Sequence, residues 1–173
     1  VRLGTRESAL AIWQAKAVEK ELNQHNIKTE IVKIKSDGDL NVNKPLYEFG
    51  VSGIFTKSLD IALLNNKIDI AVHSLKDVPS KPAKGIEIKS VLKREDPYDV
   101  LVIKNKNVDF NSNLRIATSS VRRKCQWLYK FPNHIIKPIR GNIDTRLKKL
   151  FNEDFDGAVF ALAGLKRLGF SKD

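Results

Sequence analysis

Residues 114–123 have the sequence Leu114-Arg115-Ile116-Ala117-Thr118-Ser119-Ser120-Val121-Arg122-Arg123. The first four residues form an apolar run of strand length, and the pattern over residues 119–131 predicts a helix. Three hydroxyl side chains stand at the junction, where helix caps are common. A strand that passes directly into a helix is the building unit of parallel α/β sheets.

The same alternation continues on both sides of this stretch. Strands are predicted over residues 1–5, 27–34, 68–72, 86–92, 100–103, 134–139 and 157–162, and helices over residues 7–23, 54–65 and 143–151. This order predicts an α/β fold with mainly parallel sheets and helices on both faces. The charged segment 93–99 predicts a crossing between two lobes, domain 1 over residues 1–95 and domain 2 over residues 96–173. Because ligands of such sheets bind at the carboxyl ends of the strands, we expect an active-site cleft between the lobes.

The charge of the chain points to an anionic partner. Lysine and arginine outnumber aspartate and glutamate by 31 to 20, which gives a net charge of +11. A surplus of this size favours association with negative charge. Nucleic acid, a membrane surface and a small polycarboxylate all satisfy that condition, and composition alone does not choose among them.

Cysteine and histidine usage bears on location and on metals. No apolar run approaches the ~18 residues of a membrane-spanning helix, and no signal-like apolar core follows Val1. The single Cys125 does not suit a secreted domain with paired cysteines, so we expect a cytoplasmic protein. His25, His73 and His134 are dispersed in the sequence and predict no metal site.

Several conspicuous side chains are predicted to be structural. Apolar neighbours at helical spacing assign Cys125, Trp13 and Trp127 to the core. His73 ends a strand and is predicted to be a structural histidine with satisfied hydrogen bonds.

Polar loops follow four of the predicted strands, at residues 5–8, 73–79, 118–123 and 140–146. At residues 118–120, free backbone N–H groups and the positive end of a helix are suited to a carboxylate or phosphate. Arg122 and Arg123 gain nothing from the helix dipole there, which strengthens the case for an anion site. An ordinary helix cap followed by solvated arginines is the alternative, and it stays open at this point.

Asp77 is the acid of interest among these cationic loops. It follows an apolar strand, beside Lys76. We expect nearby positive charge to lower its pKa and keep it ionised. An ionised carboxylate could stabilise a cation that develops on a substrate. The alternative is a helix or turn cap, and local sequence alone favours it, because aspartate is common at both.

Taken together, the loops resemble the porphobilinogen deaminase family. The matching stretches run in family order over residues 2–169, and they cover residues 4–11 with Trp13-Gln14, 55–57, 73–79, 94–97, 118–126, 140–142 with 145–147, and 163–169. A single such motif is weak, but the ordered set is specific. The resemblance implies a two-lobed fold like that of type II periplasmic binding proteins, followed by a small third domain.

The resemblance also implies an activity. Members condense four porphobilinogen molecules head to tail with loss of ammonia, giving hydroxymethylbilane on a covalent dipyrromethane primer. Asp77 would be the catalytic residue, and no metal is implied. Residues implied to hold the primer carboxylates are Lys76, Thr118, Ser119, Ser120, Arg122, Arg123 and Arg146. Residues implied to bind substrate or the growing chain are Arg6, Ser8, Gln14, Lys57, Arg140 and Arg167.

Two departures from the family pattern qualify these expectations. The primer is normally attached to a cysteine of the third domain, and this chain ends at Asp173 with Cys125 in a different motif. We therefore expect the chain as given to be an inactive fragment. Ser52 stands where many relatives have lysine, and the loop around residues 37–39 corresponds to the family's mobile flap.

Two other functions compete with the deaminase hypothesis. A non-catalytic, two-lobed binding protein for a small anionic solute would also explain the arginines. A nucleic-acid module would need a continuous basic stripe, whereas these arginines lie in separate strand-end loops. We expect porphobilinogen as the partner, no nucleic acid or membrane, and a monomer.

Overall fold

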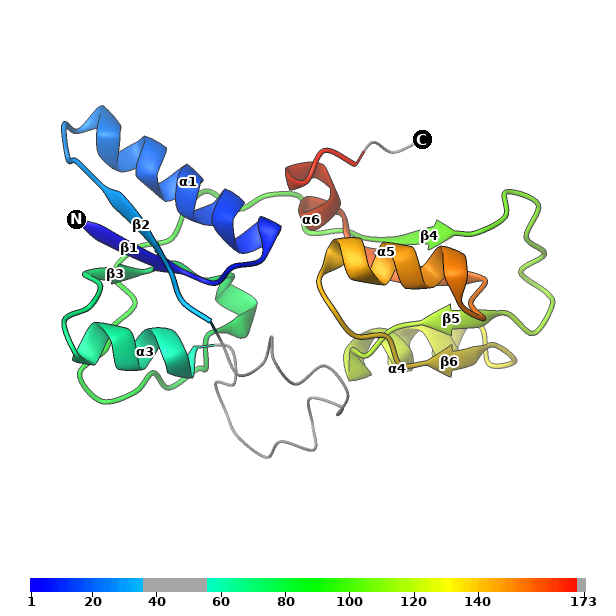
Figure 1. Cartoon of the computed structure of the whole chain (residues 1–173). Coiled ribbons are helices and arrows are strands. Elements are labelled where there is room, and N and C mark those ends of the chain that lie inside the picture. Colours follow the sequence, from blue (N-terminus) through cyan, green and yellow to red (C-terminus); the bar gives the residue numbers. More distant parts are fainter. Residues whose placement is uncertain (36–55, 171–173) are drawn as a thin grey trace. The chain divides into compact units, whose positions relative to one another are not determined.

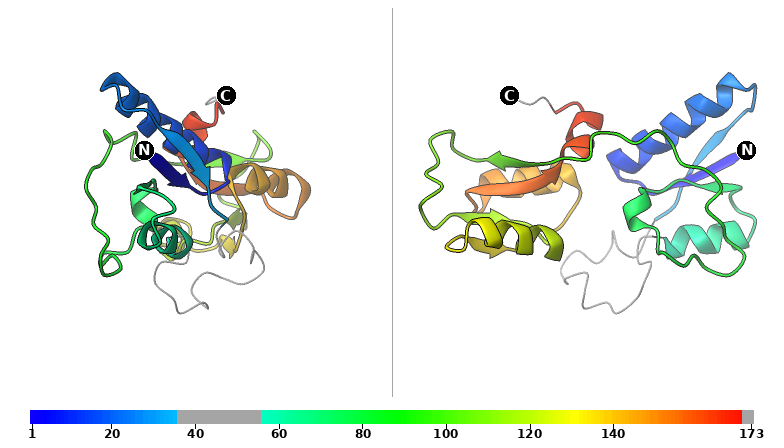
Figure 2. Two further views of the ribbon diagram at one scale, coloured as in Figure 1. Left: turned by 60° about the vertical axis from the view of Figure 1, so that its left-hand side comes forward. Right: turned by 180° about the vertical axis from the view of Figure 1, so that it is seen from behind.

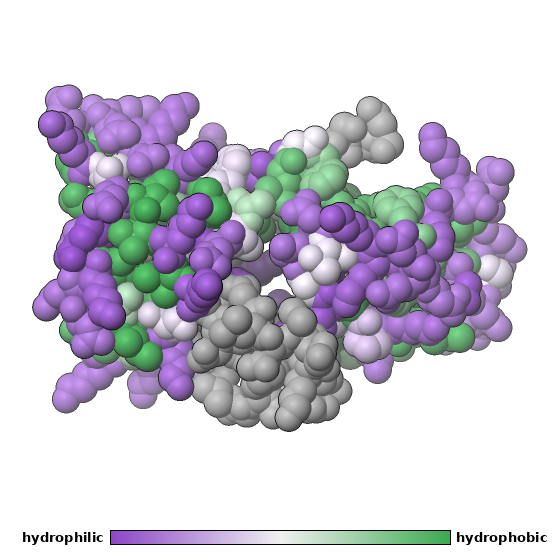
Figure 3. Space-filling view, viewed as in Figure 1, coloured by the Kyte–Doolittle hydropathy of each residue, from purple (hydrophilic) through white to green (hydrophobic). Residues whose placement is uncertain are grey.

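The computed structural model describes residues 1–35 and 56–170. The chain divides into two compact units, Val1–Arg94 and Glu95–Asp173, one residue before the predicted boundary. Hydrophilic side chains cover much of the face of each unit shown in Figure 3. No helix in the described ranges is long and apolar enough to cross a membrane.

The first unit is built on a parallel three-stranded sheet in the order β2-β1-β3. Its strands are β1 (Arg2–Thr5), β2 (Glu30–Lys33) and β3 (Ile70–Ala71). Helices α1 (Ala9–Gln24) and α3 (Lys57–Leu64) lie on opposite sides of the sheet (Figure 1). A short 3₁₀ helix, η2 (Leu75–Asp77), follows β3.

The second unit has a four-stranded sheet in the order β4-β7-β5-β6. Strands β5 (Arg115–Ala117), β6 (Ile135–Lys137) and β7 (Gly157–Ala161) are parallel, and β4 (Asp99–Ile103) runs antiparallel to β7. Figure 2 shows this sheet from behind with its helices, α4 (Val121–Lys130), α5 (Ile143–Asn152) and α6 (Leu162–Arg167). The predicted α/β class with mainly parallel sheets is therefore confirmed.

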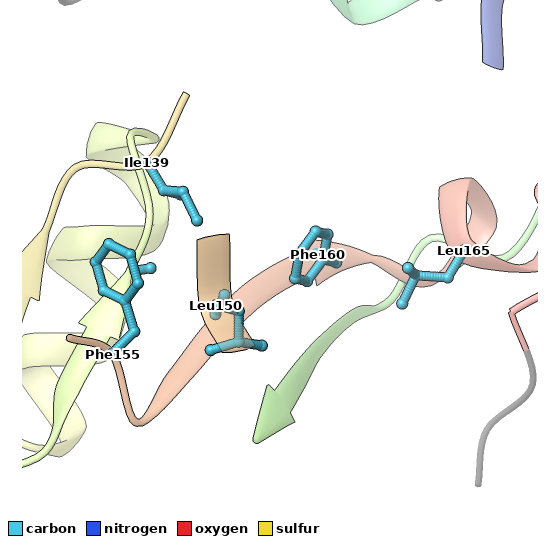
Figure 4. Close-up of a cluster of buried hydrophobic side chains, with 7 residues drawn as sticks. Ile139, Leu150, Phe155, Phe160 and Leu165 are labelled. Atoms are coloured by element: carbon cyan, nitrogen blue, oxygen red, sulfur yellow. The ribbon is translucent and has the colours of Figure 1, made fainter. Parts of the chain in front are cut away.

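The core of the second unit gathers between β5, β7 and α5. Side chains that are almost completely buried come from Ala117, Ile139, Leu150, Phe155, Ala158, Phe160 and Leu165 (Figure 4). The apolar positions of α5 that face this core, Ile143, Leu147 and Leu150, are spaced by four and three residues, which places them on one helix face. The core thus fixes α5 against β7, and this contact matters for the candidate site.

Both units use the same kind of ion pair at the start of an inner strand, β1 in the first unit and β5 in the second. In the first, Arg2 donates through Nε and Nη2 to Asp69 at 3.2 and 2.5 Å, and its backbone N–H donates to the same carboxylate at 2.7 Å. In the second, Arg115 makes the equivalent three bonds to Asp156, at 3.1, 3.2 and 2.7 Å. Each aspartate directly precedes the neighbouring strand, so the pair ties two parallel strands together at their amino ends.

The pair in the first unit gives a pH-dependent prediction. The pKa of Asp69 falls from 3.8 to about 2, chiefly because the Arg2 side chain donates to it. A lowered folded-state pKa means that the stabilisation is complete above pH 3.8 and is lost as the pH falls through about 2. We expect Asp69→Asn to lower the melting temperature at pH 7, as measured by calorimetry. The difference in melting temperature between the variant and the parent protein should become smaller below pH 4. Glu21→Gln, at an exposed position of α1, changes the net charge by the same amount and is the control. If the difference in melting temperature between Asp69→Asn and the parent does not depend on pH, the Arg2–Asp69 ion pair is not its cause.

Three expectations from the sequence are wrong in detail. Residues 86–92 form no strand. An alternating pattern favours an extended backbone, but a strand also needs a neighbouring strand to pair with, and none in the described part of the chain pairs with these residues. Trp127 packs against a buried cluster, and Cys125, two residues earlier in the helix, points to a different side of α4. Cys125 is therefore exposed. Trp13 is 39% exposed because only Ala11 and Ala15 of α1 are buried. Helix α6 was not anticipated.

Candidate functional site

The loops after β1 and β3 are held together in the first unit. Ser8 caps α1 by accepting a hydrogen bond from the Ala11 N–H at 3.4 Å, and buried Thr5 donates to the Ala11 carbonyl at 3.0 Å. Gln14, a predicted substrate contact, bonds instead to the Ser74 hydroxyl, which lies 3.0 Å from its Nε2 and 3.1 Å from its Oε1. This bond fixes the start of α1 to the loop that leads into η2.

Asp77 lies at the end of η2 with its carboxylate withdrawn from water. Burial raises its pKa above 3.8 and outweighs the opposing charges of Lys76, Arg6 and His73. The predicted lowering of this pKa is therefore wrong, because the loops remove more water than the cations compensate. Among the described residues no donor bonds to the carboxylate, and neither oxygen is completely enclosed. Asp77 is thus available to accept hydrogen bonds from a ligand.

His73 joins the same group of charges. Burial lowers its pKa, while Asp60 and Asp77 oppose that shift and Arg6 reinforces it. Its Nε2 atom is buried without a hydrogen-bond partner in the described structure, so the expectation of a fully satisfied histidine is wrong. The first unit therefore gathers Arg6, His73 and Asp77 at the carboxyl end of its sheet.

In the second unit, the hydroxyl groups after β5 serve the backbone. Ser119 Oγ donates to the Ile139 carbonyl at 2.7 Å and accepts from the Ile139 N–H at 3.0 Å, which joins the loops after β5 and β6. Ser120 caps α4 by accepting from the Arg123 N–H at 3.4 Å. Buried Thr118 accepts from the Ser120 N–H at 3.2 Å. The three hydroxyl side chains among the predicted primer contacts thus each have a hydrogen-bond partner within the protein.

Arg123 is held by a carboxylate that the sequence did not single out. Its Nε and Nη2 donate to Asp99, the first residue of β4, at 2.8 and 2.6 Å. Its Nη1 donates to the Val159 carbonyl at 3.3 Å. Asp99 therefore orients Arg123 and offsets much of its charge. Neither Asp99 nor a main-chain carbonyl carries a local signal that would have predicted this role.

Arg146 reaches the same carbonyl from α5 without an acid partner. Its Nη2 donates to Val159 at 2.9 Å, and its guanidinium lies 4.5 Å from the centre of the Phe160 ring. Within the described residues no carboxylate pairs with it, and its buried Nε has no hydrogen-bond partner. Burial, with some repulsion from Arg123, lowers its pKa from 12.5 to about 10. A buried cation without a counter-ion is a position at which an anionic ligand would be stabilised.

The other predicted contacts occupy varied positions. Lys57 and Arg122 are exposed at the first turns of α3 and α4, and Lys76 is exposed on η2. Arg140 and Arg167 are half-buried in the second unit. Ser52 and the loop around residues 37–39 lie outside the described residues. No group of three potential metal ligands occurs in the described ranges.

The loop that precedes α5 depends on a glycine. Gly141 has a φ of +114°, and a Cβ there would lie 2.7 Å from Thr145 Cγ2. We expect Gly141→Ala to destabilise the fold by about 2 kcal/mol, measured by urea unfolding, because strain and collision add. Gly169→Ala is the matched control, since Gly169 has a φ of +79° with nothing within 4 Å of a Cβ. Equal losses in the two variants would show that the collision contributes nothing.

Fold and site together define an α/β protein whose strand-end loops present a desolvated carboxylate in one unit and an uncompensated cation in the other. Comparison with known proteins gives the family. The model for "Porphobilinogen deaminase, dipyromethane cofactor binding domain" matches residues 1–173. The chain therefore belongs to the porphobilinogen deaminase family.

Named relatives agree with this assignment. The chain is 47% identical over 172 residues to a porphobilinogen deaminase of Rickettsia bellii, covering 97% of this chain and 57% of the relative. It is 46% identical over 173 residues to a probable porphobilinogen deaminase of Methanocaldococcus jannaschii, covering 99% of this chain and 59% of the relative. The chain thus spans little more than half the length of these relatives. A solved mutant of ArgBP from T. maritima aligns with 97% of this chain and 70% of its own at 14% identity, with a TM-score of only 0.42.

Proposed function

We propose that the protein acts as a hydroxymethylbilane synthase, condensing four porphobilinogen molecules head to tail with release of ammonia. The observation that carries this proposal is Asp77, a desolvated carboxylate that lacks a donor among the described residues. Such a carboxylate suits a substrate that presents N–H groups and becomes positively charged as ammonia leaves. A fixed negative group at that place stabilises the charge as it develops.

The residues of the second unit suit the cofactor that the matched family model names. Dipyrromethane carries carboxylate side chains. Among the described residues, the partly buried Arg146 has no acid partner and no hydrogen bond at its buried Nε. Arg146, Arg122 and Arg123 would hold these carboxylates, while the loop hydroxyls keep the backbone in place around them. When bound, the cofactor supplies the pyrrole end to which the first substrate unit is joined.

The chain's own residues divide the remaining work. Asp77 would accept hydrogen bonds from pyrrole N–H groups, and Arg6, its electrostatic neighbour, would attract the substrate carboxylates. Burial around Asp77 excludes water, which strengthens its interaction with a developing cation. Arg140, Arg167 and Lys57 would contribute further positive charge, with Ser8 and Gln14 shaping the start of α1. Cytoplasmic, monomeric action without nucleic acid or membrane belongs to the same proposal.

The test is turnover of porphobilinogen by the full-length protein. Substrate loss, ammonia release and formation of a linear tetrapyrrole should proceed with four molecules of porphobilinogen consumed per product. Mass spectrometry of the protein before the reaction should show the added mass of a dipyrromethane. A full-length protein that carries this group and leaves porphobilinogen unchanged would overturn the proposal.

A non-catalytic anion-binding protein is the second candidate, and Arg146 is the observation that favours it. A buried cation would hold a carboxylate with no chemistry at all. That function would assign no role to Asp77, because a carboxylate does not attract an anion. Tight binding of porphobilinogen without ammonia release, unchanged or strengthened in Asp77→Asn, would favour this second function.

A further inference from the structure

We propose that Phe160 is a positioning residue for Arg146: its ring holds the guanidinium in place without neutralising the charge that the anion site needs. The inference deepens the proposed function, on which its catalytic readout rests. It concerns a side chain that lies in the core and that would otherwise be counted only as packing.

Strand β7 supplies a hydrogen-bond acceptor and an aromatic ring to the Arg146 side chain. The guanidinium lies 4.5 Å from the ring centre of Phe160, and Nη2 donates to the carbonyl of the preceding residue, Val159, at 2.9 Å. Phe160 is 1% exposed and packs in the same core as Leu150 of α5, so the ring is fixed relative to the helix that carries Arg146 (Figure 4). Strand β7 therefore holds this guanidinium against a fixed ring and a fixed carbonyl group.

Arg123, the neighbouring arginine, is held in a different way. Arg123 shares the Val159 carbonyl at 3.3 Å, but Asp99 holds it by two bonds and offsets its charge. Arg146 has a ring in place of the carboxylate. The negative face of an aromatic ring attracts a cation, most strongly when water is excluded, yet it carries no net charge. Arg146 is thus immobilised while its full charge remains available, and its buried Nε is left for a ligand.

The matched pair of variants is Phe160→Leu and Phe155→Leu in the full-length protein. Phe155, labelled with Phe160 in Figure 4, is also buried, at 6% exposure, and belongs to the same core cluster. Its ring takes part in no cation–π contact among the residues that the structure describes. Both substitutions remove one ring from that cluster, so we expect similar decreases in melting temperature. Only Phe160→Leu removes a contact of Arg146.

Two readouts separate positioning from packing. We expect kcat/KM for porphobilinogen to fall about tenfold further in Phe160→Leu than in Phe155→Leu. Nuclear magnetic resonance of the arginine side chains should show faster rotation of the Arg146 guanidinium in Phe160→Leu alone. Phe160→Met, which fills the space without a ring, provides the same comparison if the leucine variant does not fold.

Equal behaviour of the two variants in both readouts would overturn the inference. If the parent protein does not turn over porphobilinogen, the proposed function fails, and the guanidinium rotation still decides the role of Phe160. If turnover is normal but rotation is equally slow in all variants, the proposed function stands and the positioning role is refuted.

Discussion

Asp77→Asn in the full-length protein is expected to reduce porphobilinogen turnover by about 10²- to 10³-fold, the usual cost of losing one group that stabilises developing charge. Asparagine keeps the size of the side chain and one acceptor oxygen. It loses the negative charge, and this charge is what a cation on the substrate would feel. The measurement is kcat, with the fold checked by circular dichroism.

The same substitution is expected to leave stability unchanged or improved at pH 7. Burial raises the pKa of Asp77 above 3.8, so the folded state binds this proton more tightly than the unfolded state does. Stability linked to this group is therefore greatest at low pH and is lost as the pH rises through the raised value. Removing the charge removes that cost. Loss of turnover together with a fall in melting temperature would point to a structural role.

Asp60→Asn is the control for Asp77. Asp60 is a second acid near His73 and belongs to the same group of charges, but it lies on α3 rather than on η2. We expect it to retain most of the turnover, because its charge is not the one that faces the ligand. Equal losses in the two variants would mean that the general field of this cluster matters, and that Asp77 has no special position.

Arg146→Gln is the second substitution with a large expected effect, a loss in kcat/KM of about 10²-fold from removal of an uncompensated cation in a desolvated site. Glutamine can still donate to the Val159 carbonyl, so the local backbone should hold. Lys148→Gln removes one positive charge from an exposed position of the same helix and is the matched control. If kcat/KM falls by a comparable factor in Lys148→Gln, the effect of Arg146→Gln comes from the change in net charge and not from the position of Arg146.

Stability again distinguishes function from structure at Arg146. Its pKa is lowered from 12.5 to about 10, mainly by burial, so the folded state holds this proton less tightly and stability rises with pH through that interval. At pH 7 the cost of the buried charge is fully present and is on the order of 3 kcal/mol. We expect Arg146→Gln to melt at the same temperature as the parent or higher, and a clear fall would contradict the assignment.

Local sequence predicted the parts of the site better than their pairing. The hydroxyl groups at residues 118–120 were correctly located at the junction of a strand and a helix, because capping depends on neighbours along the chain. Arg123 was predicted to hold a primer carboxylate, and its protein partner Asp99 was not foreseen, because it is 24 residues away in sequence. The helical spacing of Cys125 suggested a buried side chain, but the side of α4 that packs against a core cluster carries Trp127 and leaves Cys125 exposed.

The sequence by itself determined the α/β class, the order of strands and helices, the loops in which charge gathers, and the family. These features are encoded by backbone propensity, apolar periodicity and motifs over short stretches. Only the tertiary structure decided which charges are compensated: Arg123 by Asp99, but not Arg146, which rests on the Phe160 ring. It also decided the direction of the Asp77 pKa shift. Pairing and desolvation depend on which distant residues pack together, and no local pattern specifies that.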